Sequence, residues 1–202
     1  PNNDLDITKY DSFRNFKFYS PFHINEENGG KYLNDMKKNK TKFLRGYPSS
    51  IKKLALIALN SNITLPDLKG VLVASERMSK SNLEIISQAF QCKVFNHYGL
   101  ADICIMMGNC SKSNLLHNYE DYGYLEMGDT NNKNIKEIIG TNLHNLAMPL
   151  IRYKTNDLVE LSEKKCSCNI NFNVIKNIYG RSDSIIKTKN GFHIPITNFY
   201  TM

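Results

Sequence analysis

The chain has 202 residues, enough to bury a core as one large domain or two small ones. Hydrophobic residues at 41% and charged residues at 22% lie close to the globular average, which excludes wholesale disorder. Lys and Arg number 26 against 19 Asp and Glu, so the net charge is +7. Only five basic residues are Arg, and the lysines are mixed with Asn, so we expect a solvated basic surface and no nucleic-acid partner.

Cysteine usage and hydropathy favour a cytoplasmic protein. No apolar run reaches the length needed to span a bilayer, and residues 1–20 lack the basic start and apolar stretch of a signal peptide. The length of the chain excludes a small disulfide scaffold, and the five cysteines, odd in number and without secreted spacing, favour a reducing compartment. The sequence contains no indication of the oligomeric state.

The first forty residues are polar, aromatic and irregular, and we expect a connecting region with one short helix over Lys31–Lys38. Thr41–Tyr47 is predicted to form a buried strand, and a helix is predicted to begin at Pro48. This helix would bury one face, because four apolar residues recur at helical spacing: Ile51, Leu54, Ala55 and Ala58.

A second strand and helix follow the first pair. Leu68–Ser75 is an apolar strand, and Ser81 with Glu84 predicts a capping box at the start of the next helix. Lys93–Asn96 is predicted to be a third strand. Strands separated by single helices indicate crossover connections on a mostly parallel sheet, so the predicted fold class is α/β.

From about Tyr122 the sequence consists of short segments in which apolar and polar residues alternate, separated by Asn, Gly and Asp. This pattern predicts a β-rich part. We expect residues 1–40 to connect, residues 41–120 to form an α/β subdomain and residues 121–181 to form a β-rich subdomain. Residues 182–202 would form a hinge and the start of a truncated C-terminal domain.

Polar segments that follow the predicted strands are the candidate ligand site, because ligands of doubly wound sheets bind at the carboxyl ends of strands. Gly46–Ser50, Ala74–Glu76 and Asn96–Asp102 follow the three strands. In the β-rich part, Pro149–Asp157 and Tyr179–Asp183 carry similar side chains. Taken singly, Tyr98 and Tyr153 are better explained as core or interface aromatics, and Asp157 and Asp183 as turn residues.

In this order, the segments resemble motifs of the adenylate-forming (acyl-adenylate) superfamily. The resemblance is closest to the phenylacetate-CoA ligase-like branch and, within it, to proteins of capsular polysaccharide biosynthesis. Tyr98–Asp102 is similar to Tyr-Gly-x-Thr/Ser-Glu, and Arg152–Asp157 is similar to Arg-Tyr-x-Thr-Gly-Asp. Gly180–Asp183, with the later Gly191-Phe192, is similar to the Gly-Arg-x-Asp hinge strand. The resemblance runs from about Tyr19 to the last residue.

The resemblance implies a ligase that activates a carboxylic acid with ATP as an acyl-adenylate and commonly passes the acyl group to a thiol such as coenzyme A. Tyr98, in the Tyr98-Gly99 cofactor segment, would stack on adenine with Glu76 nearby. Asp157 would accept hydrogen bonds from both ribose hydroxyls. Arg181 would place its charge near the α-phosphate as a catalytic group, and Asp183 would be the hinge.

Three residues, in two of the motifs, depart from the family pattern. The Thr/Ser–Glu pair, which supports the α-phosphate and Mg²⁺, is Ala101–Asp102 here, and Asp102 is predicted to hold Mg²⁺ through a water. Asn156 replaces the usual Gly, and Asn tolerates left-handed turns better than most residues.

A Ser/Thr/Gly-rich phosphate loop, which the family places upstream of Tyr19, does not occur, and the family's catalytic Lys would lie downstream of Met202. We therefore expect an internal fragment of a longer enzyme that binds ATP poorly and is inactive alone.

A separate group of four residues is a candidate metal site: Cys110, His117, Cys166 and Cys168. Their spacing alone is a weak zinc signal, and free cysteines are the alternative. Some members of the resembling branch have cysteines and a histidine at comparable places, and three thiolates with one imidazole would complete a tetrahedral structural zinc site. Cys92 and Cys104 lie in apolar contexts and are predicted to be packed in the core.

Two other function classes stay open beside the adenylate-forming ligase. The first is a non-catalytic relative that acts as a binding or scaffold protein, because the Ala101–Asp102 pair weakens the family motif. The second is a zinc-stabilised nucleic-acid binder, which would need aromatic and basic residues interleaved on one strand face, a pattern that the sequence lacks. The sequence names neither the carboxylate nor the acceptor.

Overall fold

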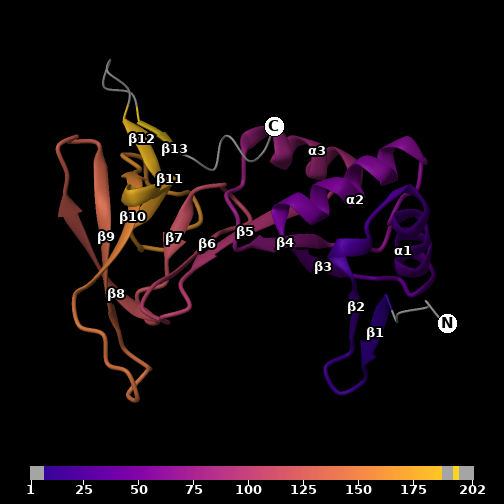
Figure 1. Ribbon diagram of the computed structural model, residues 1–202, viewed down its shortest axis with the longest axis horizontal. Coiled ribbons are helices and arrows are strands. Elements are labelled where there is room, and N and C mark those ends of the chain that lie inside the picture. Colours follow the sequence, from indigo (N-terminus) through magenta and orange to yellow (C-terminus); the bar gives the residue numbers. More distant parts are fainter. Residues whose placement is uncertain (1–6, 188–192, 196–202) are drawn as a thin grey trace. The chain divides into compact units, whose positions relative to one another are not determined.

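The computed structural model describes residues 7–187 and 193–195, which are divided between two compact units (Figure 1). One unit ends at Val94 and the other begins at Phe95. The described part combines helices and strands, as the predicted α/β class requires. Among the described residues, no helix has both the length and the apolar character that crossing a bilayer requires.

The first unit contains a hairpin, three α-helices and two parallel strands. Its elements are β1 (Thr8–Asp11), β2 (Phe16–Tyr19), a 3-10 turn (Pro21–His23), α1 (Glu26–Lys38), β3 (Phe43–Gly46), α2 (Pro48–Asn60), β4 (Gly70–Ala74) and α3 (Lys80–Phe90). β1 pairs with β2 in antiparallel register, and β3 pairs with β4 in parallel register from Phe43 opposite Gly70 to Gly46 opposite Val73.

Helix α2 confirms the helical spacing found in the sequence. Pro48 occupies its first turn, where a missing N–H leaves no intrahelical bond unmade. The helix packs against β3, β4, α1 and α3 and buries one face: Pro48, Ile51, Leu54, Ala55, Ile57 and Ala58. These side chains form the centre of the first unit's core, together with Leu33, Val71 and Ile86.

The starts of α1 and α3 differ from the sequence-based predictions. Helix α1 begins at Glu26, because the side chain of Asn25 accepts a hydrogen bond from the Asn28 N–H at 2.8 Å. The predicted capping box of Ser81 and Glu84 is wrong. The N-cap of α3 is Ser79, whose Oγ accepts from the Asn82 N–H at 3.1 Å.

The second unit is built on a meandering antiparallel sheet. Its elements are β5 (Lys93–Gly99), β6 (Met106–Asn109), β7 (Leu116–Asn118), β8 (Gly123–Asp129), β9 (Ile135–Asn142), β10 (Tyr153–Leu161), β11 (Val174–Arg181), a 3-10 turn (Ser182–Ser184), β12 (Ile185–Lys187) and β13 (His193–Pro195). Within the unit the strand order is β5-β6-β7-β11-β10-β9-β8, and β12 pairs with β13. Each neighbouring pair is antiparallel.

Strand β5 runs three residues beyond the predicted Lys93–Asn96 and ends at Gly99. The extension comes from pairing with β6, which places Tyr98 opposite Met107. Tyr98 and Gly99 therefore lie in the strand rather than in a loop after it. A methyl group on Gly99 would lie 3.1 Å from the His97 ring, which leaves little room for a side chain at this position.

The core of the second unit gathers around Cys104 and Ile105, both at 0% exposure, which confirms the predicted packing of Cys104. Gly123 lies so close to this turn that an added Cβ would stand 1.8 Å from the Cys104 carbonyl oxygen. Any side chain at position 123 would push the turn away from β8, so this close contact requires glycine.

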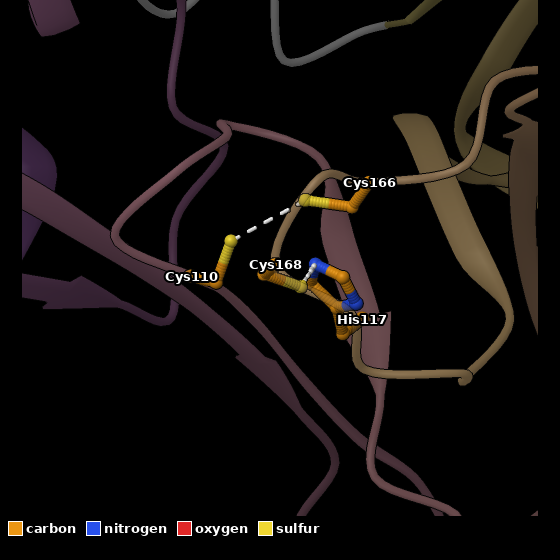
Figure 2. A group of neighbouring side chains, drawn as sticks. All are labelled: Cys110, His117, Cys166 and Cys168. Carbon is orange, nitrogen blue, oxygen red and sulfur yellow. Dashed lines mark hydrogen bonds between the residues drawn. The ribbon is translucent and has the colours of Figure 1, made fainter.

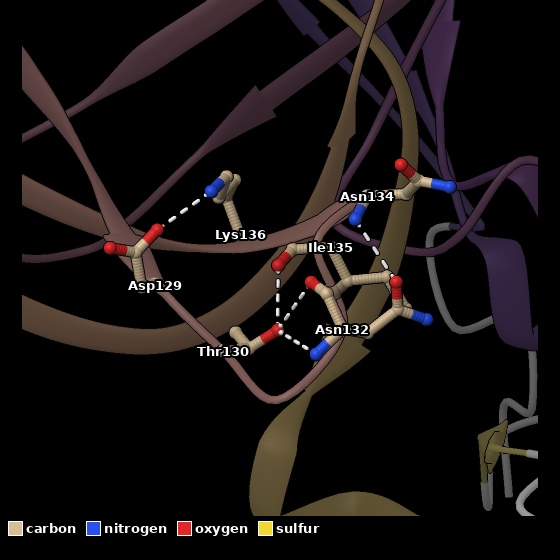
Figure 3. Close-up of polar contacts among 6 residues, drawn as sticks. All are labelled: Asp129, Thr130, Asn132, Asn134, Ile135 and Lys136. Atoms are coloured by element: carbon tan, nitrogen blue, oxygen red, sulfur yellow. Dashed lines mark hydrogen bonds and ion pairs between the residues drawn. The ribbon is translucent and has the colours of Figure 1, made fainter.

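The β8–β9 hairpin is closed by polar side chains of the Asn-rich turn between the two strands (Figure 3). The Thr130 hydroxyl lies 2.6 Å from the Ile135 carbonyl oxygen and accepts a hydrogen bond from the Asn132 N–H at 3.1 Å. Lys136 and Asp129 form an ion pair across the hairpin at 2.7 Å. The turn residues thus replace backbone pairing at the end of the two strands.

Candidate functional site

Tyr98 and Asp157, 59 residues apart in the chain, meet in the second unit. The Tyr98 hydroxyl on β5 donates a hydrogen bond of 2.6 Å to the Asp157 Oδ2 on β10. Asp157 is 8% exposed, and Tyr98 is partly buried. The structure therefore brings together the two residues for which the family resemblance implies contacts with adenine and ribose.

A bulge in β10 aims Asp157 into the unit. Asn156 has a φ of +62°, and the register with β9 shifts between Lys154 and Leu158. An asparagine adopts this left-handed conformation more readily than other non-glycine residues, which accounts for Asn at the family's glycine position. The Thr155 hydroxyl supports the turn, because it accepts from the Asp157 N–H at 3.1 Å and donates to the Ile138 carbonyl at 3.1 Å.

Arg181 and Asp183 complete the group. Arg181 on β11 lies opposite Asp157 in the strand register. Its Nε and Nη2 donate to the two carboxylate oxygens of Asp183 at 3.2 and 3.1 Å, a two-point contact between exposed side chains. Three predicted nucleotide-site residues and the predicted hinge residue therefore lie in one place.

Burial raises the pKa of Asp157 above its ordinary value, although the Tyr98 hydrogen bond and the Arg181 charge oppose the shift. Burial also raises the pKa of Tyr98, and the neighbouring Asp157 carboxylate adds to this effect. The Tyr98 phenol therefore stays protonated and serves as a hydrogen-bond donor to Asp157.

Asp102 lies in the turn that follows β5 and is partly buried. Tyr153 is at the start of β10, and interaction with the Asp102 carboxylate raises the pKa of its phenol. The next residue, Ile103, has a φ of +58°, a strained conformation for a β-branched side chain. Sequence reasoning gave Tyr153 and Thr155 no role, although both belong to the Arg152–Asp157 motif.

Glu76 lies in the first unit and has a structural contact that sequence reasoning missed. Its carboxylate accepts from the Ser49 N–H and from the Ser49 hydroxyl, both at 2.9 Å. Ser49 is in the first turn of α2, and the N-cap residue Tyr47 makes no side-chain cap. Glu76 thus caps α2 from 27 residues away and places a negative charge at the positive end of the helix.

Replacing Glu76 by Ala is expected to lower the free energy of unfolding by about 1 kcal/mol, because two N-terminal hydrogen bonds of α2 are lost. Urea denaturation measures the change. Glu84→Ala is the matched control, since Glu84 is exposed on α3 and makes one ion pair at 3.9 Å, so a change within about 0.5 kcal/mol is expected. Equal losses in the two variants would contradict the capping role.

The four residues of the candidate metal site also lie close together (Figure 2). One candidate ligand atom from each of Cys110, His117, Cys166 and Cys168 lies within 4.8 Å of every other. The Cys110 and Cys166 sulfurs are 3.5 Å apart, and the Cys168 sulfur is 3.7 Å from Nε2 of His117. His117 is on β7, Cys110 follows β6, and the two other cysteines lie in the loop between β10 and β11.

These distances fit a tetrahedral zinc ion. With Zn–S bonds of about 2.3 Å and a Zn–N bond of about 2.0 Å, neighbouring ligand atoms stand about 3.5–3.8 Å apart. His117 is 1% exposed, and its Nδ1 has no hydrogen-bond partner. Burial lowers the pKa of His117, which favours the neutral imidazole that metals bind. The chemistry and spacing of the donors therefore suit zinc.

Comparison with known proteins finds one curated relative and several solved structures with a similar fold. The chain is 26% identical to protein CapK of Staphylococcus aureus over 186 residues, which cover 90% of this chain and 40% of CapK. No protein-family profile matches the sequence. Among solved structures, 2-hydroxyisobutyryl-CoA ligase in complex with R3-HIB-AMP superposes with a TM-score of 0.70 at 20% identity, over 83% of this chain and 38% of the ligase.

A second solved structure agrees with the first. The anthranilate CoA ligase AuaEII in complex with anthranoyl-AMP matches with a TM-score of 0.57 at 15% identity, over 85% of this chain and 35% of AuaEII. The chain has the fold of part of the N-terminal domain of adenylate-forming ligases. This confirms the α/β fold class and the resemblance inferred from the motifs.

The chain spans 40% of the length of CapK. Gly191-Phe192, the last part of the hinge motif, lies outside the described residues. The predicted subdomain boundaries, including those at residues 120 and 181, stay predictions.

Proposed function

We propose that the full-length protein activates a carboxylic acid with ATP and forms an acyl-adenylate and pyrophosphate. The observation that carries this proposal is the convergence of Tyr98, Asp157 and Arg181 in a chain with the adenylate-forming ligase fold. The motif order predicts these three residues for one nucleotide site. In the reaction, a carboxylate oxygen of the acid attacks the α-phosphorus of ATP, and pyrophosphate leaves.

Each residue has a distinct part in this proposal. The Tyr98 ring offers a flat face to adenine, while its hydroxyl holds Asp157 in one orientation. The ionised Asp157 accepts hydrogen bonds from the two ribose hydroxyls. Arg181 uses two of its five N–H donors on Asp183, which leaves three for the ribose and the α-phosphate, where negative charge is redistributed.

Asp102 and Tyr153 are proposed to act at the phosphates. When bound, Mg²⁺ neutralises phosphate charge and orients the leaving group. Asp102 would hold the ion through a water, and the Tyr153 hydroxyl would fix the position of the shorter carboxylate. Asp183 is the proposed hinge for movement between half-reactions, and the Arg181 contact would break or re-form as the hinge turns.

The biological role, the branch of the family and the acyl acceptor are inferred from the relatives and the motifs. The similarity to CapK supports a role in capsular polysaccharide biosynthesis, and the motifs favour the phenylacetate-CoA ligase-like branch. Two structural neighbours are CoA ligases by name, which supports coenzyme A as the acyl acceptor. The partners are therefore a nucleotide and a small carboxylic acid.

The Cys110, His117, Cys166 and Cys168 cluster is proposed to hold a structural zinc ion. With four protein ligands, the coordination would be closed and would leave no position for a substrate. The ion would tie the β10–β11 loop to the segment around β6 and β7.

ATP–pyrophosphate exchange, measured with a panel of carboxylic acids, tests the proposed activity. We expect exchange that depends on one class of acid and that falls at least about 100-fold in Arg181→Ala, because one positive charge at the transition state is lost. Arg14→Ala is the matched control, since Arg14 is exposed, pairs with Asp11 at 3.6 Å and lies outside the motifs. ATP binding without exchange would instead support the non-catalytic relative.

A further inference from the structure

Two thiols of the cysteine cluster lie close enough to react with each other. The Cys110 and Cys166 sulfurs are 3.5 Å apart, although the residues are separated by 56 positions in the chain (Figure 2). A disulfide bond needs about 2.05 Å. Both residues are unpaired, partly exposed and outside the strands, so a small loop movement covers the difference.

We propose that Cys110 and Cys166 are a site of reversible oxidation, at which hydrogen peroxide converts the two thiols into a disulfide. This modification requires neither the proposed activity nor a bound metal, because it rests on the distance between the two sulfurs.

The chemistry proceeds in two balanced steps. The sulfur of one residue attacks a peroxide oxygen, the O–O bond breaks, and a sulfenic acid and one water form. The second sulfur then attacks the sulfenic sulfur, the S–O bond breaks, and a second water leaves as the S–S bond forms. Two thiols and one peroxide give one disulfide and two waters, and a dithiol reductant reverses the change.

The structure selects this pair among the five cysteines. The Cys110 and Cys166 sulfurs are 3.5 Å apart, whereas the Cys168 sulfur contacts the His117 ring at 3.7 Å and lies within 4.8 Å of the other two sulfurs. Cys104 is fully buried in the core of the second unit. Cys92 lies in the first unit, packed against that unit's core.

Oxidation also has a consequence for a zinc-loaded cluster. A disulfide sulfur is a poor zinc ligand, so forming the Cys110–Cys166 bond would remove two of four ligands and release the ion. One zinc ion would leave for each disulfide formed. The loop between β10 and β11 would then be held to the residue after β6 by a covalent bond in place of the metal.

Peptide mapping by mass spectrometry tests the proposal on the purified, chelator-treated chain exposed to hydrogen peroxide. We expect one linked pair of peptides containing Cys110 and Cys166, at least tenfold more abundant than any other pair and lost on reduction. Cys92 and Cys104 should remain thiols. Mainly other pairings, or sulfinic acid at both residues without a disulfide, would overturn the proposal.

Two cysteine variants and a measurement of zinc release test the proposal further. Cys168→Ser should still form the linked pair, whereas Cys110→Ser should not. In zinc-loaded protein, a colorimetric chelator should register one released ion per disulfide. A disulfide without released zinc would refute the metal proposal and leave the oxidation site standing, so the two outcomes are distinguishable.

Discussion

Replacing Asp157 by Ala in the full-length protein is expected to weaken ATP binding by about 2–4 kcal/mol, a factor of roughly 30 to 1,000. The loss follows from removing two charge-assisted hydrogen bonds to the ribose in a site where Asp157 is 8% exposed. Isothermal titration calorimetry measures the affinity. Unchanged affinity would contradict the ribose assignment.

Two matched variants separate charge from shape in this test. Tyr98→Phe keeps the aromatic face for adenine and removes the hydroxyl that donates to Asp157 at 2.6 Å, so a smaller loss of about 1 kcal/mol is expected. Asp157→Asn keeps the size of the side chain and removes its charge, and its affinity should fall nearly as far as that of the Ala variant. If Tyr98→Phe lost as much as Asp157→Ala, the hydroxyl rather than the carboxylate would carry recognition.

The same Asp157→Asn variant is expected to be more stable than the native chain, although it binds ATP more weakly. Because burial raises the pKa of Asp157 in the folded state, the folded chain binds its proton more tightly than the unfolded chain does. The free energy of unfolding therefore decreases as the pH rises above the ordinary Asp pKa of 3.8 towards the raised folded value. At neutral pH, Asp157→Asn should melt at a higher temperature than the native chain while binding ATP more weakly.

Removal of zinc is the second change with a large expected effect. A structural zinc ion contributes about 10 kcal/mol or more to the folding of small zinc-finger peptides. Even a third of that contribution would lower the melting temperature of a chain of this size by roughly 6–14 °C. We expect one zinc per chain by elemental analysis and a melting temperature that falls by this amount after chelation, measured by calorimetry.

Cysteine variants provide the control for chelation. Cys168→Ser removes one sulfur at 3.7 Å from the His117 ring, and it should bind less zinc and lose the chelator response. Cys92→Ser changes a partly exposed thiol of the first unit and should keep both. Zinc-free protein from a purification without chelator, with no shift on adding zinc, would refute the structural ion.

Local patterns in the sequence predicted much of the first unit. The helical spacing of Ile51, Leu54 and Ala58 predicts the buried face of α2, because a helix must bury its apolar side. The starts of α1 and α3 were not predicted correctly, since several polar residues compete for each N-cap. In α3, Ser79 caps the helix although Ser81 stands in the better-known pattern with Glu84.

The short strands of the second unit were not predicted. β6 and β7 have four and three residues, too few for a clear alternation, and their place in the sheet comes from partners distant in the chain. These strands extend β5 to Gly99 and bring His117 towards the β10–β11 loop. The metal cluster therefore depends on long-range pairing that no local spacing encodes.

The sequence by itself determined the order of the motifs, and with it the resemblance to adenylate-forming enzymes that the fold comparison confirms. Only the tertiary structure decided which side chains meet: Tyr98 with Asp157, Tyr153 with Asp102, and Glu76 with the start of α2. The reason is physical. Residue types and local spacing reflect the preferences of neighbouring positions, whereas contacts across 27 or 59 residues exist only after strand pairing and burial have closed the intervening chain.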